Sequence, residues 1–174
     1  MSASNPIPDA NVRSQTYYVA RATAPCWHCG MSTRVLALAM PGIHETLDID
    51  AADDGEDSGG YLAAVPWQRA GANAFLFHVH QLSQAVQHRL EDLSLHFRPA
   101  RSAATQNTYW ANHCEHCGAL LDDQELHCEP GGAFSPSSEA AAATIELLHV
   151  DAPLQATASG YALEPEFLRF MRRS

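Results

Sequence analysis

Four of the five cysteines belong to two copies of one short motif, in which two residues separate a pair of cysteines and a glycine follows. The first copy spans Cys26 to Gly30 (CWHCG) and the second spans Cys114 to Gly118 (CEHCG). Two intervening residues let both sulfur atoms of a copy point toward one centre, and the glycine tolerates the left-handed backbone of a tight turn. Each turn, which we call a knuckle, can therefore offer two thiolate ligands to a metal ion.

Two knuckles together supply four sulfur atoms, the number that closes a tetrahedral zinc site. We therefore predict one structural Zn²⁺ ion that both knuckles bind. A site closed by four thiolates leaves no coordination position for water, which argues against hydrolysis at the metal. The predicted metal ligands are Cys26, Cys29, Cys114 and Cys117.

The separation of the knuckles along the chain is unusual, because 84 residues (positions 30–113) lie between Cys29 and Cys114. A compact zinc ribbon separates its two cysteine pairs by roughly 15–20 residues. The entropy of loop closure grows only with the logarithm of loop length, so a shared site is still feasible. The metal would then fasten an N-terminal hairpin to a central one, with most of the domain inserted between them.

Three alternatives to a shared four-cysteine site stay open at this point. Each CxxC pair can be a redox motif, although neither pair opens an obvious helix after a strand. The knuckles can also bind two separate ions, or a mixed site can replace one thiolate by another ligand. The candidate replacement ligands are His28, His113, His116, His127 and Cys128. Cys128, the cysteine outside both knuckles, is otherwise expected to be a half-buried thiol.

His78 and His80 are a second pair of residues with metal-binding chemistry. On a strand their imidazoles would share one face, as half of a metal site. No carboxylate or third histidine stands at a spacing that completes it. The chain also lacks a G-x-S-x-G nucleophile motif and a lysine-containing phosphate loop. We therefore predict no catalytic residue and keep an enzyme with a site around this histidine pair as an alternative function.

The charge balance limits the partners that the chain can bind. Its formal net charge is -10, and its ten basic residues are all arginine. Nucleic-acid binding needs a basic stripe, whereas the closest groupings here are Arg98 with Arg101 and Arg172 with Arg173. We therefore favour a protein-interaction or adaptor module with a basic protein as partner, since charge complementarity speeds association. A nucleic-acid-associated zinc-ribbon protein is the second alternative, and the sequence indicates no oligomeric state.

Short apolar, β-prone segments surround the knuckles and would position them. A helix is predicted at 83–93, where Val86, Leu90 and Leu93 share one face. A second helix is predicted at 164–173, with arginines near its negative end. The predicted fold is α+β: antiparallel strands with a split zinc-ribbon-like knuckle pair, one internal helix and a C-terminal helix. Strands are predicted at 17–22, 33–40, 74–80, 105–111 and 144–150, with a return strand at 120–121 and 125–127.

Residues 1–14 are polar and contain two prolines, so we predict a flexible N-terminal arm. Residues 15–174 are predicted to form a single zinc-stabilised domain, since 46% of the chain is hydrophobic. Within it, residues 45–60 are rich in Asp and Glu without a basic residue, which indicates a solvated acidic loop. A calcium-binding loop starting at Asp50 is excluded because its twelfth position, where an acidic ligand is needed, is Tyr61.

The sequence has neither a signal peptide nor roughly 20 consecutive apolar residues that could span a membrane, so we expect a cytoplasmic protein.

These motifs resemble those of a group of uncharacterised bacterial zinc-ribbon-like proteins, in which a long insertion separates two CxxCG knuckles. The likeness lies in the first knuckle with residues 33–35 (TRV), and in residues 111–118 (ANHCEHCG) with the flanks 126–127 and 129–134. The resemblance implies a bacterial, intracellular protein that zinc stabilises and that has no assigned reaction. It implies no catalytic residue, and Cys128 lies outside its pattern.

Overall fold

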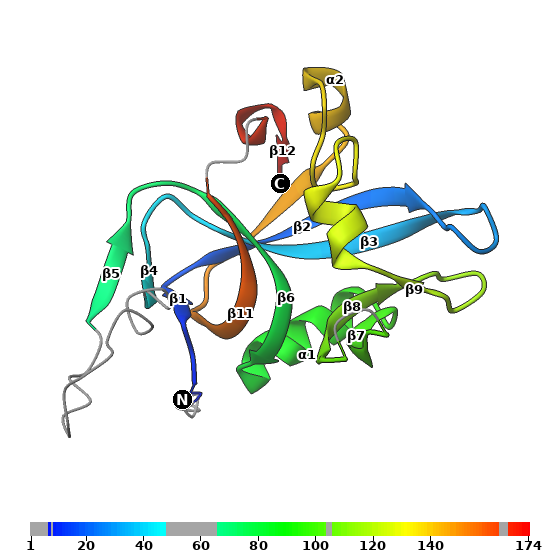
Figure 1. The fold of residues 1–174 in the computed structure, drawn as a ribbon. Coiled ribbons are helices and arrows are strands. Elements are labelled where there is room, and N and C mark those ends of the chain that lie inside the picture. Colours follow the sequence, from blue (N-terminus) through cyan, green and yellow to red (C-terminus); the bar gives the residue numbers. More distant parts are fainter. Residues whose placement is uncertain (1–6, 8, 48–65, 104–105, 164–166) are drawn as a thin grey trace, which may run out of the picture.

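The chain folds mainly into β-strands. The computed structural model describes residue 7 and residues 9–47, 66–103, 106–163 and 167–174. Over these residues twelve strands join in one curled sheet (Figure 1). The predicted α+β fold is therefore wrong, because strands dominate and the helical segments between them are short. These segments are α1 (Gln84–Leu93), the π-helix η2 (Gln124–Cys128), α2 (Glu139–Ala142) and the 3-10 helix η3 (Leu168–Phe170).

The main path of the sheet runs β12-β10-β2-β3-β6-β11-β1-β4-β5. β8 also pairs with β6 and opens a branch that contains β7 and β9. Paired strands are antiparallel, except that β12 lies parallel to β10. The strands are β1 (Val12–Ser14), β2 (Tyr17–Pro25), β3 (Ser32–Met40), β4 (His44–Leu47), β5 (Trp67–Ala70), β6 (Ala74–Leu82), β7 (Phe97–Arg101), β8 (Thr108–His113), β9 (Leu120–Leu121), β10 (Glu146–Val150), β11 (Leu154–Leu163) and β12 (Arg172–Arg173).

One face of β2 and β3 forms a first hydrophobic core together with α1. Val19 of β2 and Leu38 of β3 are buried in the same cluster as Val86 and Leu90 of α1. The internal helix predicted at 83–93 is thus present, and its predicted apolar face is the buried one. Trp110 of β8 belongs to this core as well, so the strand that leads into the second knuckle is anchored in it.

The other face of β2 and β3 forms a second core behind the knuckles. Ala22 and Val35 are buried there in one cluster with Phe134. Cys26 and Cys114 are members of the same buried cluster. The first cysteine of each knuckle is therefore part of a packed apolar layer.

The predicted C-terminal helix is wrong. After a single turn of 3-10 helix, Arg172–Arg173 pair with β10 as a short edge strand. The Arg172 N–H donates to the Ile145 carbonyl at 2.9 Å, and Leu168 and Met171 are buried in the second core. Pairing with a sheet satisfies backbone groups that a short, marginally stable helix would leave to water.

The strands predicted around the knuckles are largely present. β2, β3, β6 and β10 occupy the predicted segments, and residues 108–113 form β8. Leu120–Leu121 form the predicted return strand, whereas residues 124–128 form η2 where a strand was predicted at 125–127. The long strand β11 was not predicted, because its sequence is rich in small and polar residues.

Two predicted loop segments contribute to the sheet. Val12–Ser14, at the end of the predicted N-terminal arm, pair with β11 and β4. Glu45–Leu47, at the start of the predicted acidic loop, lie in β4 and pair with β5. The rest of that loop, residues 48–60, lies outside the described residues, as do residues 1–6 and 8 of the arm.

Candidate metal centre

Each knuckle lies at the tip of a hairpin, the first between β2 and β3 and the second between β8 and β9. Both tips project to the right in Figure 1. The Gly30 N–H donates to the Cys26 carbonyl and the Gly118 N–H to the Cys114 carbonyl, each at 2.9 Å. Both glycines adopt positive φ angles, 74° and 77°, a region that side chains disfavour. The CxxCG motif therefore builds the same turn twice.

The two turns bring all four predicted ligands together. Their sulfur atoms lie within 4.8 Å of one another. Cys26 Sγ lies 3.6 Å from Cys117 Sγ, and Cys29 Sγ lies 3.7 Å from Cys114 Sγ. These separations exceed the S–S bond length of about 2.05 Å in a disulfide. A tetrahedron with metal–sulfur bonds of about 2.3 Å places its sulfurs about 3.8 Å apart, so the cluster fits a metal ion of that size.

Solvent access divides the ligands in the same way in both knuckles. The first cysteine of each pair, Cys26 or Cys114, is buried, and the second, Cys29 or Cys117, is exposed. A backbone N–H from within each knuckle donates to the buried sulfur at 3.4 Å. Such N–H groups stabilise a thiolate, so the turn supplies both the ligands and part of their charge compensation.

The four thiols cannot all ionise easily without a cation. Burial raises the pKa of Cys114, but N–H groups of Cys117 and His116 and the neighbouring thiols lower it to about 6 overall. The Ala119 N–H lowers the pKa of Cys117, yet burial and the three other cysteines raise it to about 12. A divalent cation removes this conflict, because its charge favours the thiolate form of every ligand.

Side chains of the second hairpin also cover the free edge of β3. Asn112 is buried, accepts the Leu36 N–H at 2.8 Å and donates to the Leu36 carbonyl at 2.9 Å. Its amide group therefore takes the place that a neighbouring strand would hold. The first knuckle also contacts the second hairpin, because the indole N–H of Trp27 donates to the Leu120 carbonyl of β9 at 2.8 Å.

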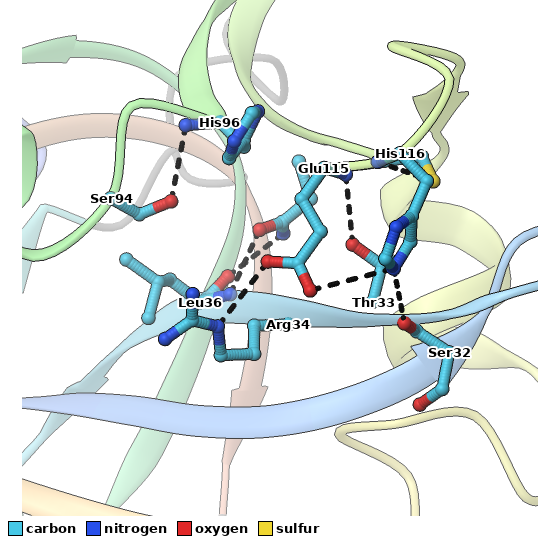
Figure 2. Close-up of polar contacts among 10 residues, drawn as sticks. Ser32, Thr33, Arg34, Leu36, Ser94, His96, Glu115 and His116 are labelled. Carbon is cyan, nitrogen blue, oxygen red and sulfur yellow. Dashed lines mark hydrogen bonds and ion pairs between the residues drawn. The ribbon is translucent and has the colours of Figure 1, made fainter.

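Three further contacts beside the sulfur cluster join the hairpins, as Figure 2 shows. The Glu115 N–H donates to Thr33 Oγ1 at 3.0 Å, and the Glu115 carboxylate pairs with Arg34 at 3.3 Å. His116 Nε2 lies 3.0 Å from the Ser32 carbonyl. The two residues between the second pair of cysteines thus bind β3, while the cysteines themselves face the first knuckle.

The alternative ligands do not join the cluster. Among the described residues, the four cysteines are the one group of three or more His, Cys, Asp or Glu side chains placed to hold a metal ion. His116 is engaged with the β3 backbone as described, and His113 Nδ1 lies 3.2 Å from the His96 carbonyl. Cys128 is exposed and outside the group.

His78 and His80 do not form a metal site together. The His80 ring is hydrogen-bonded through Nδ1 to the Thr108 carbonyl at 3.1 Å and through Nε2 to Ser159 Oγ at 2.9 Å. His78 has a φ of 48°, which interrupts the regular alternation of the strand, and its N–H donates to Asp123 Oδ2 at 2.8 Å. The pair therefore gives no support to the alternative function that we assigned to it.

Sequence reasoning missed the residues that join the hairpins without touching a metal. Asn112 is the clearest case, and its signal was a lone amide in an otherwise apolar strand, YWANH. Thr33 gave no such signal, since a threonine is ordinary in a strand. Their roles depend on which strand lies beside them, and that follows only from the folded arrangement.

Comparison with known proteins adds no family to this picture. No family model matches the chain, and neither curated proteins nor solved structures gave a match. The resemblance to zinc-ribbon-like proteins therefore stays a prediction, and the candidate site rests on its own geometry. In the part of the chain that the structure describes, no helix has the length and apolar character to cross a membrane.

Proposed function

We propose that the chain binds one structural zinc ion, and that this ion fastens the β2–β3 hairpin to the β8–β9 hairpin. The observation that carries the proposal is the grouping of four sulfur atoms within 4.8 Å of one another, with two of the separations at 3.6 Å and 3.7 Å. Zinc suits this ligand set because it accepts four thiolates without a preferred geometry of its own. The ligands are Cys26, Cys29, Cys114 and Cys117.

The ion acts on the fold and not on a substrate. Four protein thiolates complete its coordination, so no position is left for a reacting water. Outside the cluster, the hairpins are joined by a few side-chain contacts and do not share a continuous backbone ladder along residues 32–36 of β3. The metal therefore holds the relative position of the two tips.

We further propose that the fixed tips form a protein-binding surface. Trp27 within the first knuckle is 65% exposed, and Met31 directly after it is 52% exposed. The indole is already oriented by its bond to Leu120, so less side-chain entropy is lost on binding. Exposed aromatic and methionine side chains are typical of contact surfaces, and the net charge of -10 favours a basic partner.

Metal analysis of reduced, purified protein tests the first proposal. We expect one zinc per chain, and we expect Cys29→Ser and Cys114→Ser each to lose that ion. Cys128→Ser is the matched control and keeps full zinc content, because Cys128 lies outside the cluster. Two ions per chain, or independent effects of the first two variants, would contradict a shared site.

Photo-crosslinking tests the second proposal. A crosslinker at position 31 should give a discrete adduct in cells, and Trp27→Ala should remove it. Position 43 is the control, since Ile43 is 72% exposed but lies away from the knuckles. Adducts of equal yield and pattern from both positions would contradict a protein-binding surface at the tips.

A further inference from the structure

A partly buried polar cluster lies between β6, β8 and η2. It consists of His78, Tyr109, Asp122, Asp123 and His127. Tyr109 is 1% exposed and Asp123 is 3% exposed, so neither is placed to reach a substrate in solution. Asp123 stands at the N-terminal end of η2, and π-helices occur often at functional positions.

The backbone at His78 is held in an unusual conformation by Asp123. A φ of 48° is rare for a residue other than glycine. The Asp123 carboxyl accepts the His78 N–H at 2.8 Å and thereby joins η2 to β6. The ladder between β6 and β11 shifts register nearby, between Thr157 and Ala158. Strain of this kind persists only where surrounding contacts enforce it, and the hydrogen bond to Asp123 is one such contact beside the strand pairing of β6.

Aromatic rings enclose the cluster. The His127 ring stacks on Phe77 at 5.1 Å and on Phe134 at 4.9 Å. The His78 ring packs edge-on against Tyr109 at 5.0 Å. Within the described residues, His78 Nε2 is buried without a hydrogen-bond partner. The surroundings therefore offer a carboxylate little solvation.

Among the described residues, no cation acts on the Asp123 carboxyl. Burial raises its pKa to about 7, although the His78 N–H lowers it, and the Asp122 charge raises it further. Burial also lowers the pKa of His78 and brings that of His127 to about 3, so the site disfavours the charged form of both imidazoles. The remaining groups nearby are the hydroxyl of Tyr109 and the thiol of Cys128, whose pKa values burial raises.

We propose that Asp123 is a proton-operated latch, which fastens η2 to the bend of β6 when its carboxyl is neutral and releases η2 when the carboxyl ionises. η2 follows the return strand of the second knuckle, and its Leu126 packs in the second core with Cys114 and Leu121. Opening therefore loosens the segment after the second knuckle and exposes the aromatic wall of Phe77 and Phe134. Because the closed-state pKa is raised, the latch is most stable at low pH and weakens as the pH rises toward 7.

Hydrogen exchange by NMR on the zinc-loaded protein tests this latch. The equilibrium constant for opening at the Leu126 amide is the exchange rate divided by the intrinsic rate. It should increase roughly 100-fold between pH 5 and pH 8 and level off above the Asp123 pKa of about 7. The His78 amide shift should titrate with the same midpoint. Asp123→Asn should abolish both effects, since the amide keeps an acceptor for the His78 N–H without a charge.

Asp122→Asn is the matched control, and it should lower the midpoint while leaving the titration in place. An unchanged pH dependence in Asp123→Asn would overturn the latch. If that variant fails to fold, the carboxyl carbon shift of Asp123 in the unmodified protein decides the question. A midpoint above 6 supports the latch, and a lower one overturns it.

Discussion

Removal of the metal should cost the protein a large part of its stability. The predicted ion links Cys29 to Cys114 and closes a loop across positions 30–113. A crosslink that closes a loop of this length restricts the unfolded chain by about 4.5 kcal/mol in the loop-entropy treatment. A domain of this size has a total unfolding free energy of about 5–15 kcal/mol. Chelation should therefore remove between a third and nearly all of the stability.

The figure of about 4.5 kcal/mol applies when zinc stays bound to the unfolded chain. If zinc leaves on unfolding, the stabilisation is set by the zinc affinity of the folded protein and by the free zinc concentration. Of the four proposed ligands only Cys26 and Cys114 belong to a core, and the first core contains neither of them. We therefore expect chelation to weaken the fold and free the two tips.

Urea unfolding of the reduced protein, with zinc and after chelation, measures the effect. With a slope near 2 kcal/mol/M, the midpoint should fall by about 2 M on chelation. Cys114→Ser should have the urea midpoint of the chelated protein even when zinc is present. Cys128→Ser should have the urea midpoint of the zinc-loaded protein. A fall of less than about 0.5 M, or a Cys114→Ser variant as stable as the zinc-loaded protein, would refute the reasoning that the metal joins the hairpins.

Three further predictions concern single side chains in the packed regions. Asn112→Ala should lower the unfolding free energy by about 2–4 kcal/mol in urea melts, because it leaves buried N–H and C=O groups of Leu36 unpaired. Gly160→Ala should lower the melting temperature, because a Cβ there collides with the Phe77 ring, whereas Gly71→Ala has free space and should not. Burial lowers the pKa of His127 to about 3, so stability should fall below pH 6.5, by about 2 kcal/mol at pH 5 relative to His127→Phe in pH-dependent melts.

The four cysteines of the cluster could be predicted because their signal is local. Two residues between cysteines and a following glycine define the turn, and this turn is the same wherever it stands in a fold. The strands β2 and β3 were also predictable, since their apolar residues alternate or run together over nine residues each. The pairing of the two knuckles across the intervening chain was a hypothesis that the sulfur geometry now supports.

The rest of the fold depends on neighbours that the sequence does not reveal. β11 contains small and polar residues, and its strand state follows from pairing with β6 and β1. The C-terminal segment has helical composition, but the open edge of β10 accepts it as a strand. Asp123 looks like an ordinary surface acid in the sequence, and only the enclosing rings and the bend at His78 give it an unusual environment.

The most direct test of the central claim is X-ray absorption at the zinc edge of the purified, reduced protein. A single ion shared by both knuckles predicts four sulfur neighbours at about 2.3 Å and no nitrogen or oxygen in the coordination shell. A shell with one or more nitrogen or oxygen ligands, or fewer than four sulfurs per zinc, would contradict the site built from Cys26, Cys29, Cys114 and Cys117.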